Sequence, residues 1–147
     1  MLPVELEDFL HRHIPLSKAM GVSVASVDED TVVLRAPLAP NINHRGTVFG
    51  GSVSAVAMLA GWSLLHTRLA AAGLRPRLVI RRNTMEYEAP ITGDFVARAS
   101  ILRNDEWQRF IATLERKGRA RIAVSAALEH GDQVVATFAG EFVAFEG

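Results

Sequence analysis

The sequence predicts an α+β fold in which an antiparallel sheet wraps one long central helix, with a short helix at the N-terminus. The first observation behind this prediction is a stretch of 20 residues, 46–65, that carries no charged side chain. The second is that β-rich segments separated by short turn signals fill the chain after this stretch, which favours antiparallel pairing. A chain of 147 residues can bury one core, so we expect a single domain over residues 1–147.

The N-terminal part predicts a helix followed by a hairpin. In residues 3–13, Pro3 suits a first turn, acidic residues follow it, and His and Arg residues close the segment, which matches the helix dipole. Pro15 is expected to end this helix. Residues 16–36 are then expected to form a β-hairpin, because apolar and polar residues alternate before an acidic turn at 28–30.

The central helix is expected to run from Gly50 to about Ala72, with Gly73 in a C-cap position. A helix with so little charge must be enclosed on most sides by the sheet. The uncharged stretch is nominally long enough to cross a bilayer. We expect no membrane association, because the stretch contains four Gly and three Ser residues and the remaining chain has the pattern of amphipathic strands.

After the central helix, the sequence predicts strands only. The turns between them carry Pro, Gly, Asn and Asp residues, which are typical of tight turns. The expected strands are Arg77–Glu88, Asp94–Arg103, Gln108–Lys117, Ala120–Glu129 and Val134–Phe145. A lone domain of this design leaves a strand edge and apolar surface uncovered, so we expect a homodimer or a dimer of dimers.

The composition excludes several classes of function. Because the charges of 16 basic and 16 acidic residues cancel, the chain lacks the net positive charge that favours binding to nucleic acid or to an anionic membrane. The absence of Cys excludes disulfide scaffolds, thiolate metal sites and a Cys nucleophile. It also fits a reducing cytoplasm, and the acidic N-terminus lacks the order of a signal peptide. We therefore expect a cytoplasmic protein without a metal or cofactor.

The loop before the central helix resembles a known motif. Asn43, Gly46, Phe49, Gly50 and Gly51 stand at the spacing of the Asn-x-x-Gly-x-x-His-Gly-Gly motif of many hotdog thioesterases, with Phe49 in the place of the His. This resemblance implies the hotdog fold, in which a sheet wraps the central helix. It also implies an acyl thioesterase whose substrate is carried by CoA or by acyl carrier protein.

Further residues make the resemblance closer. Residues 85–99 resemble the strand–Pro–x–x–Gly–Asp–strand turn of hotdog thioesterases. Thr47, Ser52 and residues 59–62, together with the motif, resemble the thioesterase domain at the C-terminus of YiiD-type proteins. In those proteins the domain is fused to a GNAT acetyltransferase domain, whereas here the resemblance covers nearly the whole chain.

The glycine pair, Gly50 and Gly51, is the candidate site for the thioester carbonyl. Thioester hydrolysis develops negative charge on the carbonyl oxygen, and free N–H groups at a helix N-terminus stabilise such charge. Alternatively, the glycines only permit tight turns and close packing. By the resemblance, Asn43 positions water or the carbonyl, and its alternative is an ordinary loop Asn. Thr47 and Ser52 are candidates for helix caps or substrate contacts.

The sequence does not provide the acid or base that the resemblance implies. Comparable thioesterases carry Asp or Glu about two turns into the helix, where this chain has Met58, and no carboxylate occurs between residues 46 and 72. Ser54 is a hydroxyl without a base. The strand after the helix offers Asn83 to orient water, and alternation predicts that Asn83 shares one face of this strand with Met85 and Tyr87. The remaining candidates are the carboxylates Glu86 and Glu88, acting within the subunit or across a dimer interface, and His44 in the loop.

Other residues are candidates for substrate binding. Arg81, Arg82 and the basic segment 116–121 could pair with the phosphates of CoA, or they are solvated strand faces. Phe49 and Trp62 could line an acyl tunnel or simply pack in the core.

Three functions therefore compete. The first is an acyl thioesterase that hydrolyses acyl-CoA or acyl-carrier-protein thioesters. The second is a non-catalytic protein that binds the same ligands, which the missing carboxylate favours. The third is a dehydratase or hydratase, and Phe49 with the carboxylate-free helix argues against it because that chemistry needs a His and an acid.

Overall fold

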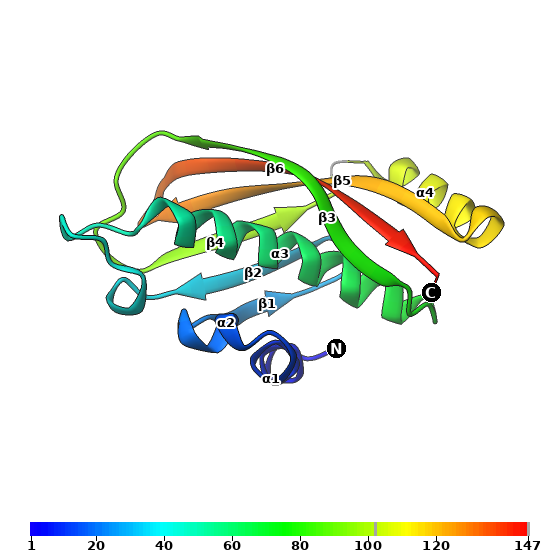
Figure 1. The fold of residues 1–147 in the computed structure, drawn as a ribbon, viewed down its shortest axis with the longest axis horizontal. Helices are drawn as coiled ribbons and strands as arrows, with labels where there is room; N and C mark the ends of the chain where they lie inside the picture. The colour runs from blue at the N-terminus through cyan, green and yellow to red at the C-terminus, as the bar shows by residue number, and fades with distance from the viewer. Residues whose placement is uncertain (102, 147) are drawn as a thin grey trace.

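The computed structural model describes residues 1–101 and 103–146, in which six strands form one antiparallel sheet that curves around a long helix (Figure 1). The strand order is β1-β2-β4-β5-β6-β3. The strands are β1 (Ser23–Val27), β2 (Thr31–Ala36), β3 (Arg77–Tyr87), β4 (Phe95–Ser100), β5 (Arg119–His130) and β6 (Gln133–Phe145). The helices are α1 (Pro3–His13), α2 (Pro15–Ala19), the short 3-10 helix η1 (Ala39–Asn41), α3 (Gly50–Ala71) and α4 (Asn104–Lys117). The predicted hotdog architecture is confirmed.

The N-terminal prediction is confirmed for the first helix and partly wrong for the hairpin. Pro15 ends α1 but also opens α2, because Pro at the first helical position costs no hydrogen bond. The hairpin therefore begins only at β1. Its turn forms as expected, with the carboxylate of Asp28 accepting from the backbone N–H groups of Asp30 and Thr31 at 2.8 Å each.

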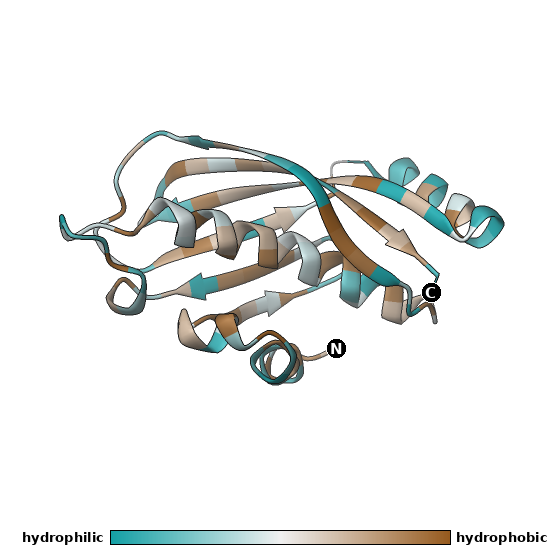
Figure 2. Ribbon diagram, viewed as in Figure 1, coloured by the Kyte–Doolittle hydropathy of each residue, from teal (hydrophilic) through white to brown (hydrophobic). Residues whose placement is uncertain are grey.

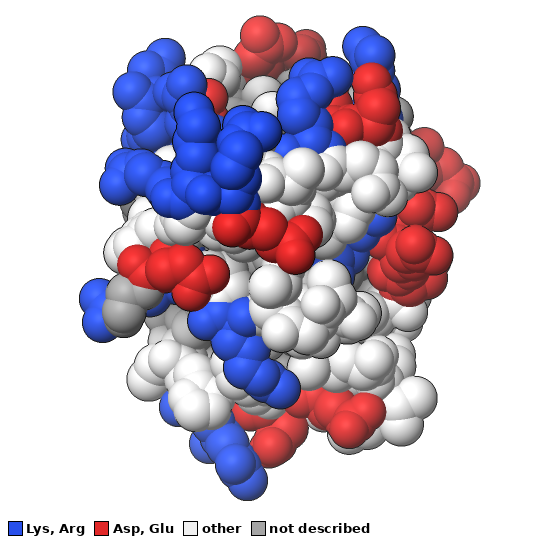
Figure 3. Space-filling model, turned by 90° about the vertical axis from the view of Figure 1, so that its right-hand side faces the viewer, with Lys and Arg blue, Asp and Glu red and all other residues white. Residues whose placement is uncertain are grey.

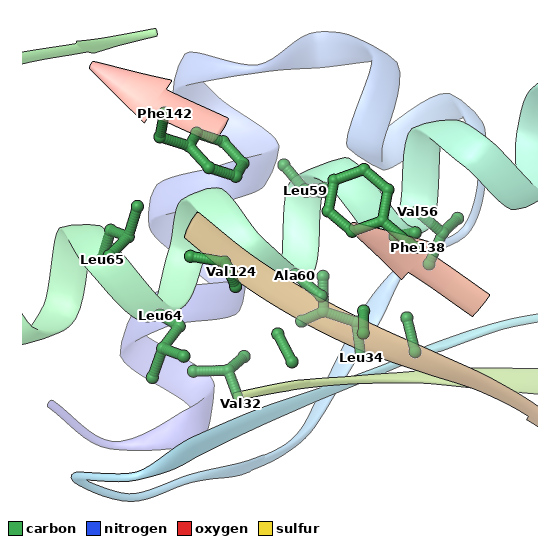
Figure 4. Close-up of a cluster of buried hydrophobic side chains, with 14 of the residues drawn as sticks. Val32, Leu34, Val56, Leu59, Ala60, Leu64, Leu65, Val124, Phe138 and Phe142 are labelled. Atoms are coloured by element: carbon green, nitrogen blue, oxygen red, sulfur yellow. The ribbon is translucent and has the colours of Figure 1, made fainter. Parts of the chain in front are cut away.

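The central helix α3 is the core of the fold, as predicted. Apolar side chains of its middle turns, from Val56 to Leu65, meet the inner face of the sheet (Figure 4), and Phe142 of β6 is fully buried against the helix. A Cβ atom at Gly61 would lie 3.2 Å from the Phe142 ring, so glycine lets the helix approach the sheet closely. The helix ends at the predicted glycine: Gly73 has a φ of 77°, and Leu74 N–H donates to Leu69 O at 2.9 Å in a Schellman motif.

The helix α4 contradicts the predicted strand Gln108–Lys117 and the predicted turn at 104–106. Its buried side chains, Trp107, Phe110 and Leu114, recur at helical spacing, which outweighs the alternation assumed for a strand. Acidic residues occupy the first turn and basic residues the last, which matches the helix dipole. The helix lies at the end of the sheet and turns a hydrophilic surface outward (Figure 2). The predicted strand Asp94–Arg103 is confirmed over β4, and residue 102 lies outside the described residues.

The strand β3 forms an edge of the sheet and pairs only with β6 in the described part of the chain. A bulge between Ile80 and Arg82 changes which residues face α3. Beyond the bulge, Asn83, Met85 and Tyr87 stand opposite inward-facing residues of β6, so the predicted common face of these three is confirmed. Within the described residues, no helix meets the length and hydropathy needed to span a bilayer.

Candidate functional site

The glycine pair lies at the N-terminus of α3, directly after a short loop. The loop is fastened on both sides, since Val48 N–H donates to Ile91 O at 2.9 Å and Phe49 N–H donates to Asn41 O at 2.8 Å. Asn41 is itself buried, and its amide donates to the backbone carbonyls of Met20 and Pro37. The start of α3 is therefore a fixed part of the fold.

Asn43 organises the turn inside this loop. Its Oδ1 atom accepts from the N–H groups of Arg45 at 2.8 Å and Thr47 at 3.2 Å. Its Nδ2 atom donates to the Thr47 hydroxyl at 2.8 Å. The turn also contains Gly46, whose φ of 82° favours glycine. Asn43 and Thr47 thus bind each other in the structure, and His44 lies exposed in the same turn.

The first N–H groups of α3 are available to a ligand. The N-cap residue is Phe49, and no side chain caps the helix, so the predicted capping by Thr47 or Ser52 is not observed. Ser52 N–H donates to Phe49 O at 2.9 Å. Among the described residues, the N–H groups of Gly50 and Gly51 have no hydrogen-bond acceptor. Two adjacent unpaired donors therefore stand at the positive end of a 22-residue helix.

A pocket whose lining includes one acidic residue, Glu88, opens on one side of the glycine pair. This carboxylate pocket has a volume of about 280 Å³, and its lining includes Gly50, Tyr87, Glu88, Pro90 and Ile91. The Tyr87 hydroxyl donates to Gly50 O at 3.0 Å. Sequence reasoning did not single out Tyr87 as a site residue, although its position on the helix-facing side of β3 was the signal that could have found it.

The structure distinguishes the two candidate carboxylates. Glu86 stands opposite Thr137 on the outer face of the sheet, directed away from α3. Glu88 follows the last residue of β3, and its backbone N–H donates to Val135 O at 2.8 Å. Only Glu88 lines the carboxylate pocket.

An apolar groove opens on the other side of the glycine pair. It has a volume of about 330 Å³ and runs along α3 past Gly51, Ser54, Met58 and Trp62, with Ile14 and Leu16 forming the opposite wall. Met58, at the position where the resemblance implies a carboxylate, thus lines an apolar surface. The Phe49 ring lies against Gly51, where a Cβ atom on Gly51 would overlap it. Phe49 itself is 58% exposed.

Asn83 and the arginines lie away from the glycine pair. Asn83 is exposed on β3, about 13 Å along the strand from Tyr87 at about 3.3 Å per residue. Arg81 contacts the Glu141 carboxylate at 2.7 Å, and Arg121 contacts it at 4.0 Å. The hydrogen bond from Arg81 lowers the pKa of Glu141.

The fold therefore joins two basic segments that are separate in the sequence. Arg82 stands opposite Glu141 across the strand pair and makes no ion pair among the described residues. Figure 3 shows that Lys and Arg side chains gather on the end of the molecule that carries α4 and the C-terminus. In residues 1–101 and 103–146, no group of three or more His, Asp or Glu side chains is placed to hold a metal ion.

Comparisons with known proteins identify the family. A protein of unknown function from Chlorobaculum tepidum TLS is 30% identical, with a TM-score of 0.92, and the match covers 99% of this chain and 98% of that chain. A protein from Shewanella oneidensis described as a "putative thioesterase" is 24% identical, with a TM-score of 0.87 over 97% of this chain and 96% of that one. A protein from Pseudomonas aeruginosa described as a "probable thioesterase" is also 24% identical, with a TM-score of 0.85 over 99% of this chain and 97% of that one.

The structural similarity to the last two proteins, at 24% identity, establishes that the fold is shared. A family profile shows that the sequences are related as well. The profile described as "Putative thioesterase (yiiD_Cterm)" matches residues 4–146. The chain therefore belongs to the yiiD_Cterm thioesterase family of hotdog-fold proteins.

Proposed function

We propose that the protein hydrolyses acyl thioesters carried by CoA or by acyl carrier protein. The observation that carries this proposal is the pair of unpaired N–H groups on Gly50 and Gly51, which lie between a pocket lined in part by Glu88 and an apolar groove. A thioester needs these three environments: donors for its carbonyl oxygen, a base for water, and an apolar channel for its acyl chain. Membership of a thioesterase family supports the same reaction class.

The glycine pair would stabilise the charge that develops on the carbonyl oxygen. As water adds to the carbonyl carbon, the oxygen becomes an oxyanion, and donors fixed before the reaction stabilise it without further reorganisation. The helix start is fixed by the bonds of Val48 and Phe49, and the uncharged first turn leaves the helix dipole unopposed. Asn43 and Thr47 contribute by holding the loop that presents the glycines.

Glu88 is the proposed general base. It would take a proton from the attacking water while the new C–O bond forms, and the tetrahedral intermediate would then release the thiolate as the C–S bond breaks. The proton passes to the thiolate, so the products are a carboxylic acid and a thiol. Tyr87 positions Gly50 through its hydrogen bond to the Gly50 carbonyl. Ser52 and Ser54 lie beside the carbonyl site and supply hydroxyl groups for polar contacts with the substrate.

Arg81 and Arg82 are the proposed partners of the CoA phosphates. Arginine pairs well with phosphate. Arg81 and Arg121 contact the single carboxylate of Glu141 and Arg82 stands opposite it across the strand pair, which leaves an excess of positive charge. Arg82 lies about 17 Å along β3 from Tyr87, a separation comparable to the reach of an extended carrier arm.

We further propose that the protein acts as a homodimer or a dimer of dimers in the cytoplasm. The edge of β3 has backbone hydrogen-bonding groups that a strand of a second copy can pair with. A second copy would also cover the exposed apolar side chains of Phe49, Val79 and Tyr87. Asn83 is too distant from the glycine pair of its own subunit, so its proposed role in orienting water requires the second subunit. The absence of Cys in the chain supports the reducing compartment.

One observation favours a second function, acyl-thioester binding without turnover. The helix position that the family resemblance assigns to a carboxylate is Met58, and it lines the apolar groove. A protein with this arrangement would bind the acyl chain and the carbonyl but leave water unactivated unless Glu88 acts.

The experiment that separates these functions measures thiol release and equilibrium binding with a panel of acyl-CoAs and acyl carrier proteins. The thioesterase proposal predicts turnover with at least one carrier. Binding of acyl-CoA without thiol release from any member of the panel would contradict it and support the binding function. Sedimentation of the same preparation tests the dimer, which a monomer at assay concentration would contradict.

A further inference from the structure

We infer that Trp62 closes the apolar groove and sets the longest acyl chain that the protein accepts, at roughly ten carbons. This inference rests on the proposed function, because it takes the carbonyl of the substrate to lie at the glycine pair. It adds a residue that determines specificity and a class of substrate, medium-chain acyl thioesters.

Trp62 is held rigidly between three elements. Its indole Nε1–H donates to the backbone carbonyl of Leu78 in β3 at 3.0 Å. Its ring is nearly parallel to that of Phe9 in α1, with an interplanar angle of 14° and 6.3 Å between centroids. It also stacks on His66, one turn further along α3, at 4.8 Å and 10°. The ring therefore spans the gap between α1 and β3 and cannot easily turn aside.

A second pocket lies behind this ring. Its volume is about 430 Å³, and its lining includes Phe9, His66, Leu74 and Leu78. Trp62 is the only residue that this rear pocket shares with the groove that begins at Gly51, among the described residues. The indole is thus a wall between the apolar groove and the rear pocket, whose lining also includes Arg75 and Arg77.

The position of one end of the groove and the side chains of its walls identify the occupant. One end is Gly51, whose free N–H belongs to the proposed carbonyl site, and the walls between Gly51 and Trp62 are almost wholly apolar. An acyl chain attached to a carbonyl at Gly51 has this groove as its continuation. No charged side chain lines the groove within the described residues, which favours an apolar occupant over an ionic one.

The length of the groove gives the length of the chain. Gly51 and Trp62 are 11 positions apart on α3, which corresponds to about 16 Å of helix axis. An extended polypeptide spans about 3.5 Å per residue, and each residue contributes three backbone bonds. An extended acyl chain therefore advances about 1.2 Å per bond. After space is left for the carbonyl and the indole ring, roughly ten carbons fit.

The test is the dependence of kcat/KM on acyl length for acyl-CoAs of about four to about eighteen carbons. For the wild type, we expect kcat/KM to rise about fourfold per methylene, from about 0.8 kcal/mol per buried CH₂, and then to stop rising near ten carbons. Trp62→Ala joins the groove to the rear pocket and should move this limit to longer chains. Met58→Trp places an indole one turn earlier and should move it to shorter chains.

A control and a second readout separate this inference from the proposed function. Trp107→Ala removes the other Trp, which lies in α4, and should leave the length limit in place even if it costs stability. Non-hydrolysable thioether analogues of the same acyl-CoAs report chain-length dependence through their dissociation constants, with or without turnover. The same limit in the wild type and in both groove variants would overturn the role of Trp62 and leave the thioesterase intact. If the wild type bound none of the analogues and hydrolysed none of the acyl-CoAs, both proposals would fail.

Discussion

The Tyr87 hydroxyl donates a hydrogen bond of 3.0 Å to the carbonyl oxygen of Gly50, which ties the last residue of β3 to the first residue of α3. This bond joins two elements that are far apart in the sequence at the point where both line the carboxylate pocket. The position of the glycine pair relative to Glu88 therefore depends on it.

Replacement of Tyr87 by Phe removes this bond and keeps the ring. We expect the free energy of unfolding to fall by about 0.5–1.5 kcal/mol, the usual net contribution of one hydrogen bond, as measured by urea denaturation. We also expect a lower kcat, because Gly50 is held less firmly. Unchanged kcat and stability in Tyr87→Phe would show that the bond does not position the helix start.

The role of Glu88 is tested by a matched pair of variants. Glu88→Gln should lower kcat by roughly two to four orders of magnitude, the usual contribution of a general base. Glu86→Gln makes the same chemical change two residues away on the outer face of the sheet, and its kcat should stay near that of the wild type. Equal losses in the two variants, measured with one acyl-CoA, would contradict the assignment.

Asn43 is expected to act on stability through the loop. Asn43→Ala removes the acceptor for two N–H groups and the donor to the Thr47 hydroxyl, so we expect unfolding to become easier by about 1–3 kcal/mol. Asn43→Asp keeps the acceptor oxygen and should recover part of this loss. If Asn43→Ala lost activity with no change in its denaturation midpoint, Asn43 would instead contact the substrate or water.

His66 gives the protein a pH-dependent stability. Burial lowers the pKa of His66 below 6.5, and the positive charges of Arg75 and His13 lower it further. Between the folded and unfolded pKa values the unfolded chain binds more protons, so stability rises with pH and is lost as the pH falls below about 6.5. The melting temperature should therefore fall from about pH 7.5 to about pH 5.5. His66→Phe, which keeps a stacking ring, should show a smaller fall, and an equal fall would contradict the account.

Arg82 should affect substrate binding more than the chemical step. Removal of a phosphate-pairing charge in Arg82→Ala is expected to raise KM for acyl-CoA about tenfold, or about 1.4 kcal/mol, with little change in kcat. Arg35→Ala is a suitable control, because Arg35 is an exposed arginine on the distant strand β2. The same KM in Arg82→Ala and the wild type would remove Arg82 from the binding site.

The sequence was sufficient for the parts of the fold that depend on local pattern. The uncharged stretch and Gly73 predicted α3 and its end, and the motif placed the glycine pair at its start. The helix α4 was not predicted, because Trp107, Phe110 and Leu114 are few enough to fit a strand when the packing partner is unknown. Their burial against neighbouring elements is a tertiary effect that the pattern alone does not contain.

The parts of the site that depend on tertiary packing were only partly predictable. The common face of Asn83, Met85 and Tyr87 followed from alternation, since all three lie after the bulge. The bond from Tyr87 to Gly50 and the choice of Glu88 over Glu86 depend on how β3 meets the start of α3. The apolar groove depends on α2, which the sequence did not predict as a helix.

The central claim, that the N–H groups of the glycine pair bind the thioester carbonyl, has a direct test at Gly50. Gly50→Pro deletes one N–H at the first helical position, where Pro is accepted, and the extended conformation of Phe49 suits a residue before Pro. Gly50→Ala keeps the N–H, and its Cβ would lie 3.7 Å from the Tyr87 ring, an ordinary contact. We predict that kcat for an acyl-CoA falls about 10²–10³-fold in Gly50→Pro and stays near the wild-type value in Gly50→Ala. Equal kcat in the two variants, with both folded, would contradict the account.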